Sequence, residues 1–163
     1  MSFRVYWRRG SGGGTFRGRV RACFDGDTML VDSDRGLITV RIWGIDAPEP
    51  GQPLFREARE ALKAMLLGSV ATFHGVELDN YGRTVARVTG AGAGDVGRAM
   101  VAAGLAWWCK MFAPAAEGLR AAEREARRRH LGIWGTGRRP IGPWTWRRLM
   151  RSRSGSASVI TGS

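Results

Sequence analysis

The sequence is poor in cysteine, histidine and acidic residues, and the shortage of cysteine already excludes some kinds of site. Its 163 residues include two Cys, two His and 14 Asp plus Glu, against 26 Lys plus Arg. Cys23 and Cys109 lie far apart and form no Cys-x-x-Cys spacing, so they indicate neither a zinc site nor a disulfide framework. As buried free thiols they would favour a reducing compartment, although only weakly.

Long apolar runs are missing as well. No stretch approaches the ~20 apolar residues that a membrane-spanning helix needs. Arg8, Arg9 and the Gly-Ser-Gly-Gly-Gly run at 10–14 interrupt the N-terminal segment, which as written contains no standard secretion signal. This glycine run also lacks the Lys-Ser/Thr ending of a phosphate-binding loop. We therefore expect a cytoplasmic protein, or a secreted one if the start codon is misassigned.

The excess of basic residues gives a formal net charge of +12 and a pI near 11.4. Solubility alone does not require such an excess, which implies a polyanionic partner. Most of the basic residues are arginines, whose planar guanidinium groups bind phosphate oxygens in pairs, so DNA or RNA is the favoured polyanion. A generally basic protein from an arginine-rich proteome is the alternative that charge alone leaves open.

Composition divides the chain into three segments. We predict a flexible basic arm over 1–15 and one folded domain over 16–146, because 163 residues fit a single core. The segment 147–163 is basic and then rich in Ser and Gly, and we expect it to be disordered. Its arginines could form a nucleic-acid-binding arm or a solvated tail. Trp144 and Trp146 are expected to pack this end of the chain onto the domain, with base stacking as the alternative.

The domain shows the pattern of a small, mainly β structure of the α+β class. Strands are predicted at 16–24, 28–32, 37–43, 69–76 and 84–89, and helices at 54–66, 95–103 and 114–130. In the third strand, aliphatic residues alternate with Arg41, which therefore points away from the core face. The strands are too short and too closely joined for parallel crossovers. We predict a five-stranded OB-fold Greek-key barrel with three helices, acting as a monomer.

Carboxylates follow two of these strands. Asp27 lies in the Asp-Gly-Asp turn before the second strand, and Asp46 and Glu49 follow the third. Two carboxylates on neighbouring strand ends can share a hard cation, and the backbone carbonyl of Ala47 can add a third oxygen. Glu49, placed just beyond such a metal, could orient or deprotonate a water molecule that the cation has made more acidic.

Two arginines complete this arrangement. Arg41 and Arg83 could donate forked hydrogen bonds to the oxygens of a phosphodiester, where charge accumulates in the five-coordinate transition state. By themselves, the Asp-Gly-Asp turn is a common hairpin and the Asp46–Glu49 segment could be a helix-entry turn. Their occurrence together with both arginines favours a catalytic site.

Several motifs resemble, in order, those of the staphylococcal nuclease (thermonuclease) family. They are Asp25-Gly-Asp-Thr28, Arg41-Ile-Trp-Gly-Ile-Asp-Ala-Pro-Glu49, Asp79-Asn-Tyr-Gly-Arg83 with Val85-Ala86, Leu105-Ala-Trp107, Glu123 to Arg127 and Gly132-Ile-Trp134. The resemblance covers roughly 16–146. It implies an OB-fold, calcium-dependent phosphodiesterase, an endonuclease or exonuclease that acts on DNA and RNA and leaves 3′-phosphate ends.

The resemblance also implies residue roles. Asp27, Asp46 and the Ala47 carbonyl would bind calcium, Glu49 would be the general base, Arg41 and Arg83 would hold the phosphate, and Tyr81 would lie near the terminal phosphate. The chain departs from the family pattern in three places: an alanine at position 47 replaces threonine, the loop after Glu49 is short, and a base-stacking tyrosine is missing at 108–112.

Other functions fit parts of the sequence. A non-catalytic OB module that binds single strands is the main rival, because some members of the family have lost their acids. His74 and His130 could form a metal-free acid/base pair, although structural or surface roles fit their positions better. The arm containing 3–9 could instead adhere to an anionic membrane.

Overall fold

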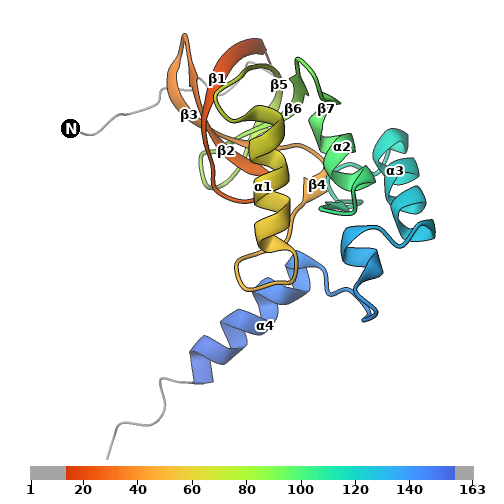
Figure 1. Ribbon diagram of the computed structural model, residues 1–163. Helices are drawn as coiled ribbons and strands as arrows, with labels where there is room; N and C mark the ends of the chain where they lie inside the picture. The colour runs from red at the N-terminus through yellow and green to blue at the C-terminus, as the bar shows by residue number, and fades with distance from the viewer. Residues whose placement is uncertain (1–13, 157–163) are drawn as a thin grey trace, which may run out of the picture.

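Five β-strands form the centre of the computed structural model, which describes residues 14–156 (Figure 1). They are β1 (Thr15–Cys23), β2 (Thr28–Ser33), β3 (Gly36–Ile42), β5 (Val70–Leu78) and β6 (Thr84–Gly90). Neighbours pair antiparallel in the order β3-β2-β1-β5-β6, and parallel pairing of β3 with β6 closes the barrel. The predicted five-stranded OB-type barrel is confirmed, and every strand lies within two residues of its expected bounds.

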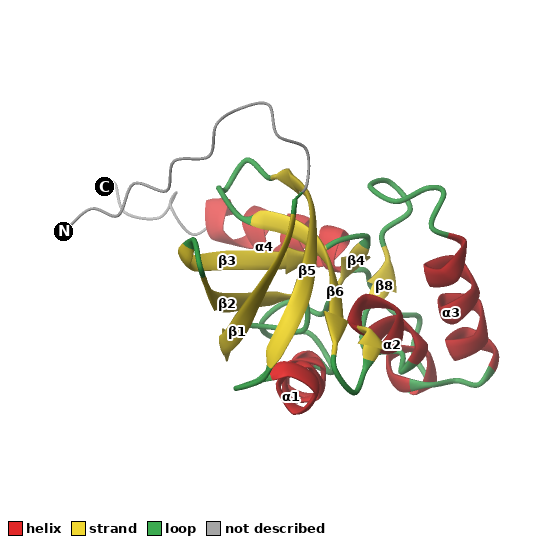
Figure 2. Ribbon diagram, turned by 90° about the horizontal axis from the view of Figure 1, so that it is seen from above, coloured by secondary structure: helices red, strands yellow, loops and turns green. Residues whose placement is uncertain are grey.

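Three short strands extend this framework. β7 (Gly94–Asp95) pairs with the end of β6, while β4 (Ile45–Asp46) pairs with β8 (Trp107–Trp108) in a separate two-stranded sheet. Figure 2 shows β4 beside β8, on the side of the barrel where α2 and α3 lie. This pairing sets Asp46 opposite Trp107 and fixes the backbone from which the Asp46 carboxylate projects.

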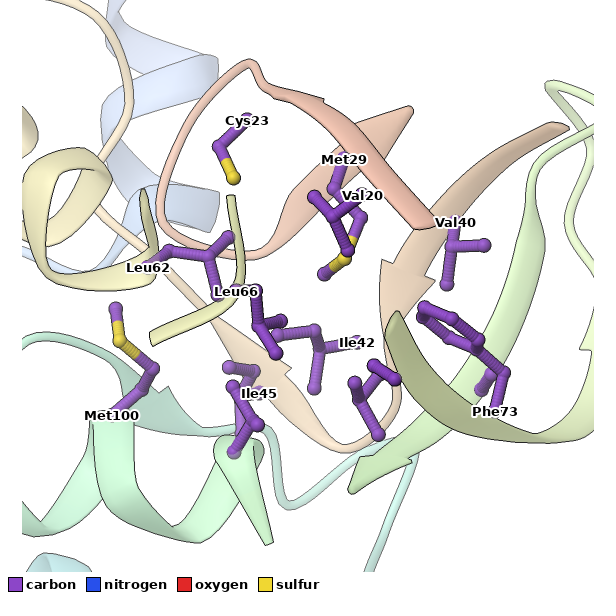
Figure 3. Close-up of a cluster of buried hydrophobic side chains, with 14 of the residues drawn as sticks. Val20, Cys23, Met29, Val40, Ile42, Ile45, Leu62, Leu66, Phe73 and Met100 are labelled. Atoms are coloured by element: carbon purple, nitrogen blue, oxygen red, sulfur yellow. The ribbon is translucent and has the colours of Figure 1, made fainter. Parts of the chain in front are cut away.

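Alternating side chains fill the barrel. Ile38, Val40 and Ile42 on β3 are buried, whereas Arg41 between them points out of the aliphatic core, as the sequence predicted. Phe73 from β5 and Leu62 from α1 are fully buried in the same cluster (Figure 3). Burying an aliphatic or aromatic side chain of this size contributes about 1.5–3 kcal/mol.

The three predicted helices are present. α1 (Phe55–Leu66) buries Ala58, Leu62 and Leu66 along one face, and α2 (Val96–Ala102) begins after Asp95, whose side chain accepts a hydrogen bond from the Arg98 N–H at 2.9 Å. α3 (Glu117–Arg128) is followed by a 3-10 turn, η1 (Gly132–Gly135). The Asp95 side chain satisfies an N–H at the start of α2 that has no partner within the helix.

A fourth helix, α4 (Pro143–Ser156), was not expected, and it includes the first part of the segment that the sequence predicted to be a disordered tail. The 147–156 part of the predicted tail is helical, while 157–163 and the arm at 1–13 lie outside the described residues. The Trp144 ring meets the Trp107 ring edge-on at 6.3 Å, and Trp146 Nε1 donates to the Pro50 carbonyl at 3.3 Å. Tryptophan contacts therefore hold a helix that its arginine-rich composition does not predict. Over 14–156, no helix combines the length and apolar character needed to cross a membrane.

Candidate active site

The turn between β1 and β2 buries Asp27. Asp25 Oδ1 accepts hydrogen bonds from the N–H groups of Asp27 at 2.9 Å and Thr28 at 2.7 Å, which fixes the turn. A Cβ at Gly26 would lie 2.8 Å from the Cβ atoms of both Ala47 and Ala58, so the glycine lets this turn approach those residues. Asp27 is only 5% exposed as a result.

The Asp27 carboxylate joins two parts of the chain. Its Oδ2 accepts the Ala47 N–H at 2.8 Å, and its Oδ1 accepts the Thr28 hydroxyl at 2.9 Å. Burial, followed by the charge of Asp25, raises the pKa of Asp27 to about 6, although Arg41 and the Ala47 hydrogen bond oppose this rise. A buried carboxylate with this environment gains strongly from a nearby cation.

Arg41 and Asp46 lie on either side of the bend between β3 and β4. Gly44 forms the bend with φ +76°, and a Cβ there would lie 2.8 Å from Leu119 Cδ1. Arg41 Nη2 is 3.1 Å from Asp46 Oδ1 and 3.7 Å from Asp27 Oδ2, so one guanidinium spans both carboxylates. Burial alone would lower the pKa of Arg41, but Asp27 and Asp46 raise it, while burial raises the pKa of Asp46.

A side-chain amide holds the turn that carries Glu49. Gln52 Oε1 accepts the Glu49 N–H at 2.7 Å, and the Gln52 N–H donates back to the Glu49 carbonyl at 2.9 Å. Gln52 Nε2 donates to the Ile141 carbonyl at 2.9 Å, which links the turn to the segment before α4. Gln52 is 6% exposed, and the hydrogen bonds of its Oε1 and Nε2 satisfy both ends of this buried polar side chain next to the site.

Arg147 on α4 is part of this cluster. Its Nη2 lies 2.7 Å from Asp46 Oδ2, its Nη1 lies 3.2 Å from Asp46 Oδ1, and Nη1 also donates to Glu49 Oε1. Burial would lower the pKa of Arg147, but its hydrogen bonds with the two carboxylates raise the pKa above its ordinary value. The sequence reasoning missed this residue. Trp144 and Trp146 indicated that the segment packs on the domain, yet they did not show which arginine turns inward.

Arg83 belongs to a neighbouring cluster. Its Nε lies 2.7 Å from Asp79 Oδ2, and Asp79 Oδ1 accepts the N–H groups of Tyr81 at 2.9 Å and Arg83 at 3.0 Å. Burial would raise the pKa of Asp79, but these hydrogen bonds outweigh it and lower the pKa. Tyr81 is 83% exposed, and the Arg83 guanidinium lies over its ring at 5.4 Å. Asp79 therefore orients both the arginine and the tyrosine.

The structure brings most of the predicted site residues together. Asp27, Arg41, Asp46 and Ala47 are linked through direct contacts, and Glu49 joins them through Arg147, which contacts both Glu49 and Asp46. Arg83 and Tyr81 form the separate cluster around Asp79. The two clusters come from adjacent strands, because β3 and β6 pair in parallel from Val40 and Thr84. Among residues 14–156, no group of three or more His, Cys, Asp or Glu is arranged to hold a metal.

The two histidines lie apart from this site. His74 on β5 shares a hydrogen bond with Thr15 Oγ1 through its Nδ1 at 3.0 Å. His130 follows α3 with a positive φ of 52°. These positions agree with structural or surface roles and give no support to a histidine acid/base pair.

Barrel and site together define a nuclease-like protein, in which buried acids and arginines lie at one end of an OB-type barrel. The family model described as "Staphylococcal nuclease homologue" matches residues 39–136. The match covers more than half of the chain and includes Arg41, Asp46, Glu49 and Arg83. The chain belongs to the staphylococcal nuclease family.

Relatives from bacteria and plants support this assignment. An uncharacterized endonuclease of Escherichia coli O157:H7 is 33% identical over 130 residues, with 80% of this chain and 84% of the relative covered. A micrococcal nuclease of Shigella flexneri is 34% identical over 146 residues, with coverage of 84% and 83%. The probable staphylococcal-like nuclease CAN1 of Oryza sativa subsp. japonica is 36% identical over 113 residues, covering 69% of this chain and 33% of the plant protein.

Proposed function

We propose that the protein is a calcium-dependent nuclease that hydrolyses phosphodiester bonds of DNA and RNA and leaves 3′-phosphate ends. The observation that carries this proposal is the convergence of Asp27, Arg41, Asp46 and Glu49 on one partly buried cluster. Membership of a nuclease family and the names of the relatives support the same activity. The basic surface implied by a net charge of +12 would attract a polyanionic substrate.

The residues at the site fit a hard divalent cation. Asp27 and Asp46 are 5% and 3% exposed, and one nitrogen of Arg41 contacts both, so the two carboxylates face the same region of the site. Ala47 is hydrogen-bonded to Asp27 through its N–H and can offer its carbonyl as a further oxygen ligand. Calcium prefers six to eight oxygen ligands, so water would supply the rest. Bound calcium would make a coordinated water more acidic and would offset the charge of the phosphate.

The protein's own groups would perform the remaining steps. Glu49, held on its turn by Gln52, would orient the attacking water and accept its proton. Arg41 and Arg83, from adjacent strands, would donate hydrogen bonds to the non-bridging phosphate oxygens as negative charge accumulates on them. The exposed Tyr81 beside Arg83 would contact the terminal phosphate of the bound strand.

The direct test is digestion of plasmid DNA and of RNA by the full chain, with calcium and with chelator. Glu49→Gln and Arg83→Ala should each lower the cleavage rate by about 10²–10³. Arg124→Ala, an exposed substitution on α3 with the same change in charge, should leave the rate unchanged. Undiminished cleavage in chelator would refute the metal-dependent mechanism. Tight, salt-sensitive binding without cleavage under any divalent ion would indicate the non-catalytic single-strand-binding module instead.

A further inference from the structure

Arg147 occupies the acids that the proposed mechanism needs. We propose that this guanidinium is an intramolecular competitor of the divalent cation, and that α4 is a displaceable strap that carries it onto Asp46 and Glu49. This inference rests on the proposed function, because it assumes that Asp46 binds the metal and that Glu49 handles the water.

The contacts of Arg147 use the positions that a cation would need. The guanidinium fork covers both oxygens of Asp46 and reaches Glu49 Oε1, while Arg41 already contacts Asp46 Oδ1. Such bidentate, charge-assisted hydrogen bonds are among the strongest that a carboxylate forms. A divalent cation that binds Asp46 must take a carboxylate oxygen that Arg147 now holds, and it would then lie close to the Arg147 guanidinium. Repulsion between them makes the two occupants mutually exclusive.

The balance of charge supports exclusion. Arg147 offsets part of the negative charge of Asp46 and Glu49. On the other side of Asp46, Arg41 is shared with Asp27, beside which Asp25 adds further negative charge. Docking of Arg147 therefore weakens the electrostatic attraction of the cluster for a divalent cation, and its departure strengthens it. Arg83 does not change this balance, because its partner is Asp79.

The attachment of α4 permits displacement. The helix extends away from the barrel, with its first turns beside the loop that precedes α1 (Figure 1). This end of the chain meets the site loop through the hydrogen bonds from Trp146 Nε1 to the Pro50 carbonyl and from Gln52 to the Ile141 carbonyl, and through the Trp146 ring, which would lie 3.5 Å from a Cβ at Gly51. Trp144, which meets Trp107 edge-on, is 50% exposed. From 144 to 153 every residue of α4 is exposed or only partly buried, and elements with few fully buried side chains open at lower free-energy cost than the core.

Competition has a measurable consequence. The apparent cation affinity equals the intrinsic affinity multiplied by the fraction of molecules in which the strap is undocked, and by linkage the bound cation must weaken docking of α4. Coupling free energies between sites in proteins typically correspond to factors of about 5 to 150. Removing the guanidinium should therefore tighten calcium binding within this range.

The test is isothermal titration of calcium into the full chain at fixed pH and ionic strength. Arg147→Ala should bind calcium about 5- to 150-fold more tightly than the wild type. Arg148→Ala is the matched control, because it removes an exposed guanidinium from the adjacent position of the same helix, and its calcium affinity should equal that of the wild type. Equal affinities of Arg147→Ala and wild type, or weaker binding by Arg147→Ala, would overturn the inference.

A second variant separates contact from charge. Trp146→Ala removes the hydrogen bond to Pro50 and keeps Arg147, so it should weaken docking of α4, and because alanine favours helix it does not lower the helix propensity of the segment. This variant should also bind calcium more tightly. In the wild type, calcium should increase hydrogen exchange over 143–156, a readout that is independent of cleavage. Unchanged exchange together with unchanged affinity of Trp146→Ala would also overturn the inference.

The two proposals fail in different ways. If the wild type cleaves only with calcium but Arg147→Ala binds calcium no more tightly, the competitor role is wrong and the proposed function stands. If cleavage persists in chelator, or if neither protein binds calcium, the metal-dependent function itself is wrong. A slower Arg147→Ala enzyme with unchanged calcium affinity would assign Arg147 to the phosphate instead.

Discussion

The Ala47 N–H donates a 2.8 Å hydrogen bond to Asp27 Oδ2 and so ties the turn after β1 to the segment that follows β4. These residues are 20 positions apart in the chain, and both are buried. This bond places one proposed calcium ligand against the backbone of the other proposed ligands. Asp27 therefore accepts a hydrogen bond that supports the fold and also carries a negative charge at the proposed metal site. Substitutions can separate these two roles.

Asp27→Asn and Asp27→Ala should differ in stability and agree in activity. Asparagine keeps an oxygen that can accept the Ala47 N–H, whereas alanine leaves this buried donor unpaired, at a cost of about 1–3 kcal/mol in the free energy of unfolding. Both variants lose the carboxylate, so neither should cleave nucleic acid with calcium. Urea denaturation and a digestion assay measure the two effects. Equal stability of the two variants would show that the hydrogen bond contributes nothing.

The elevated pKa of Asp27 predicts how calcium affinity depends on pH. Burial and the charge of Asp25 raise this pKa from 3.8 to about 6, so below pH 6 the metal must displace a proton. Calcium affinity should therefore fall by up to about tenfold per pH unit on going below this value. Without metal, the folded state takes up the proton before the unfolded chain does. The contribution of Asp27 to the free energy of unfolding thus increases as the pH falls from about 6 towards 3.8.

Titration calorimetry between pH 5 and 7 checks the first part of this prediction, and urea denaturation of the metal-free protein over the same range checks the second. Calcium affinity that stays constant across this range would contradict a pKa of about 6 for Asp27.

Gly26 can be tested as the residue that lets the Asp27 turn approach the barrel. A Cβ at this position would lie 2.8 Å from the Cβ atoms of Ala47 and Ala58, closer than packed carbon atoms allow. Gly26→Ala should lower the free energy of unfolding by about 1–3 kcal/mol, and it should lower activity by moving Asp27. Gly92→Ala is the control, because a Cβ at that position would meet nothing within 4 Å beyond its neighbours in the chain, and it should change neither quantity. A fully active and stable Gly26→Ala protein would show that the turn has room to move.

Local patterns in the sequence were sufficient for the barrel and for the face of β3 from which Arg41 projects. Alternation of Ile38, Val40 and Ile42 with Arg41 predicted both the core face and the outward arginine, and the structure confirms it. The contact of Arg147 with Asp46 could not be predicted in this way, because 101 positions separate the two residues. The only local signal near Arg147 was a pair of tryptophans in an acid-free segment, and composition favoured disorder there. Tertiary contacts decided both the helix and the arginine that turns inward.

Asp79 should act on catalysis through Arg83. It accepts hydrogen bonds from both the Arg83 N–H and the Arg83 side chain, at 3.0 Å and 2.7 Å, and so holds the guanidinium near the β3 strand end that carries Arg41. Asp79→Ala should lower kcat/KM on an oligonucleotide by about tenfold, because a phosphate clamp that is free to rotate loses part of its preorganisation. Calcium affinity should not change, since Asp79 belongs to a cluster separate from Asp27 and Asp46.

A double-mutant cycle distinguishes this positioning role from a general structural one. If Asp79 works only by orienting Arg83, then in an Arg83→Ala background the further change Asp79→Ala should have no additional effect on kcat/KM. Losses that simply add would mean that Asp79 acts on the substrate or on the fold independently of Arg83. Asp79→Ala should lower the melting temperature in both backgrounds, because it also frees the backbone N–H groups of Tyr81 and residue 83. With kcat/KM measured well below these melting temperatures, an effect that vanishes once Arg83 is absent would report the orientation of the arginine.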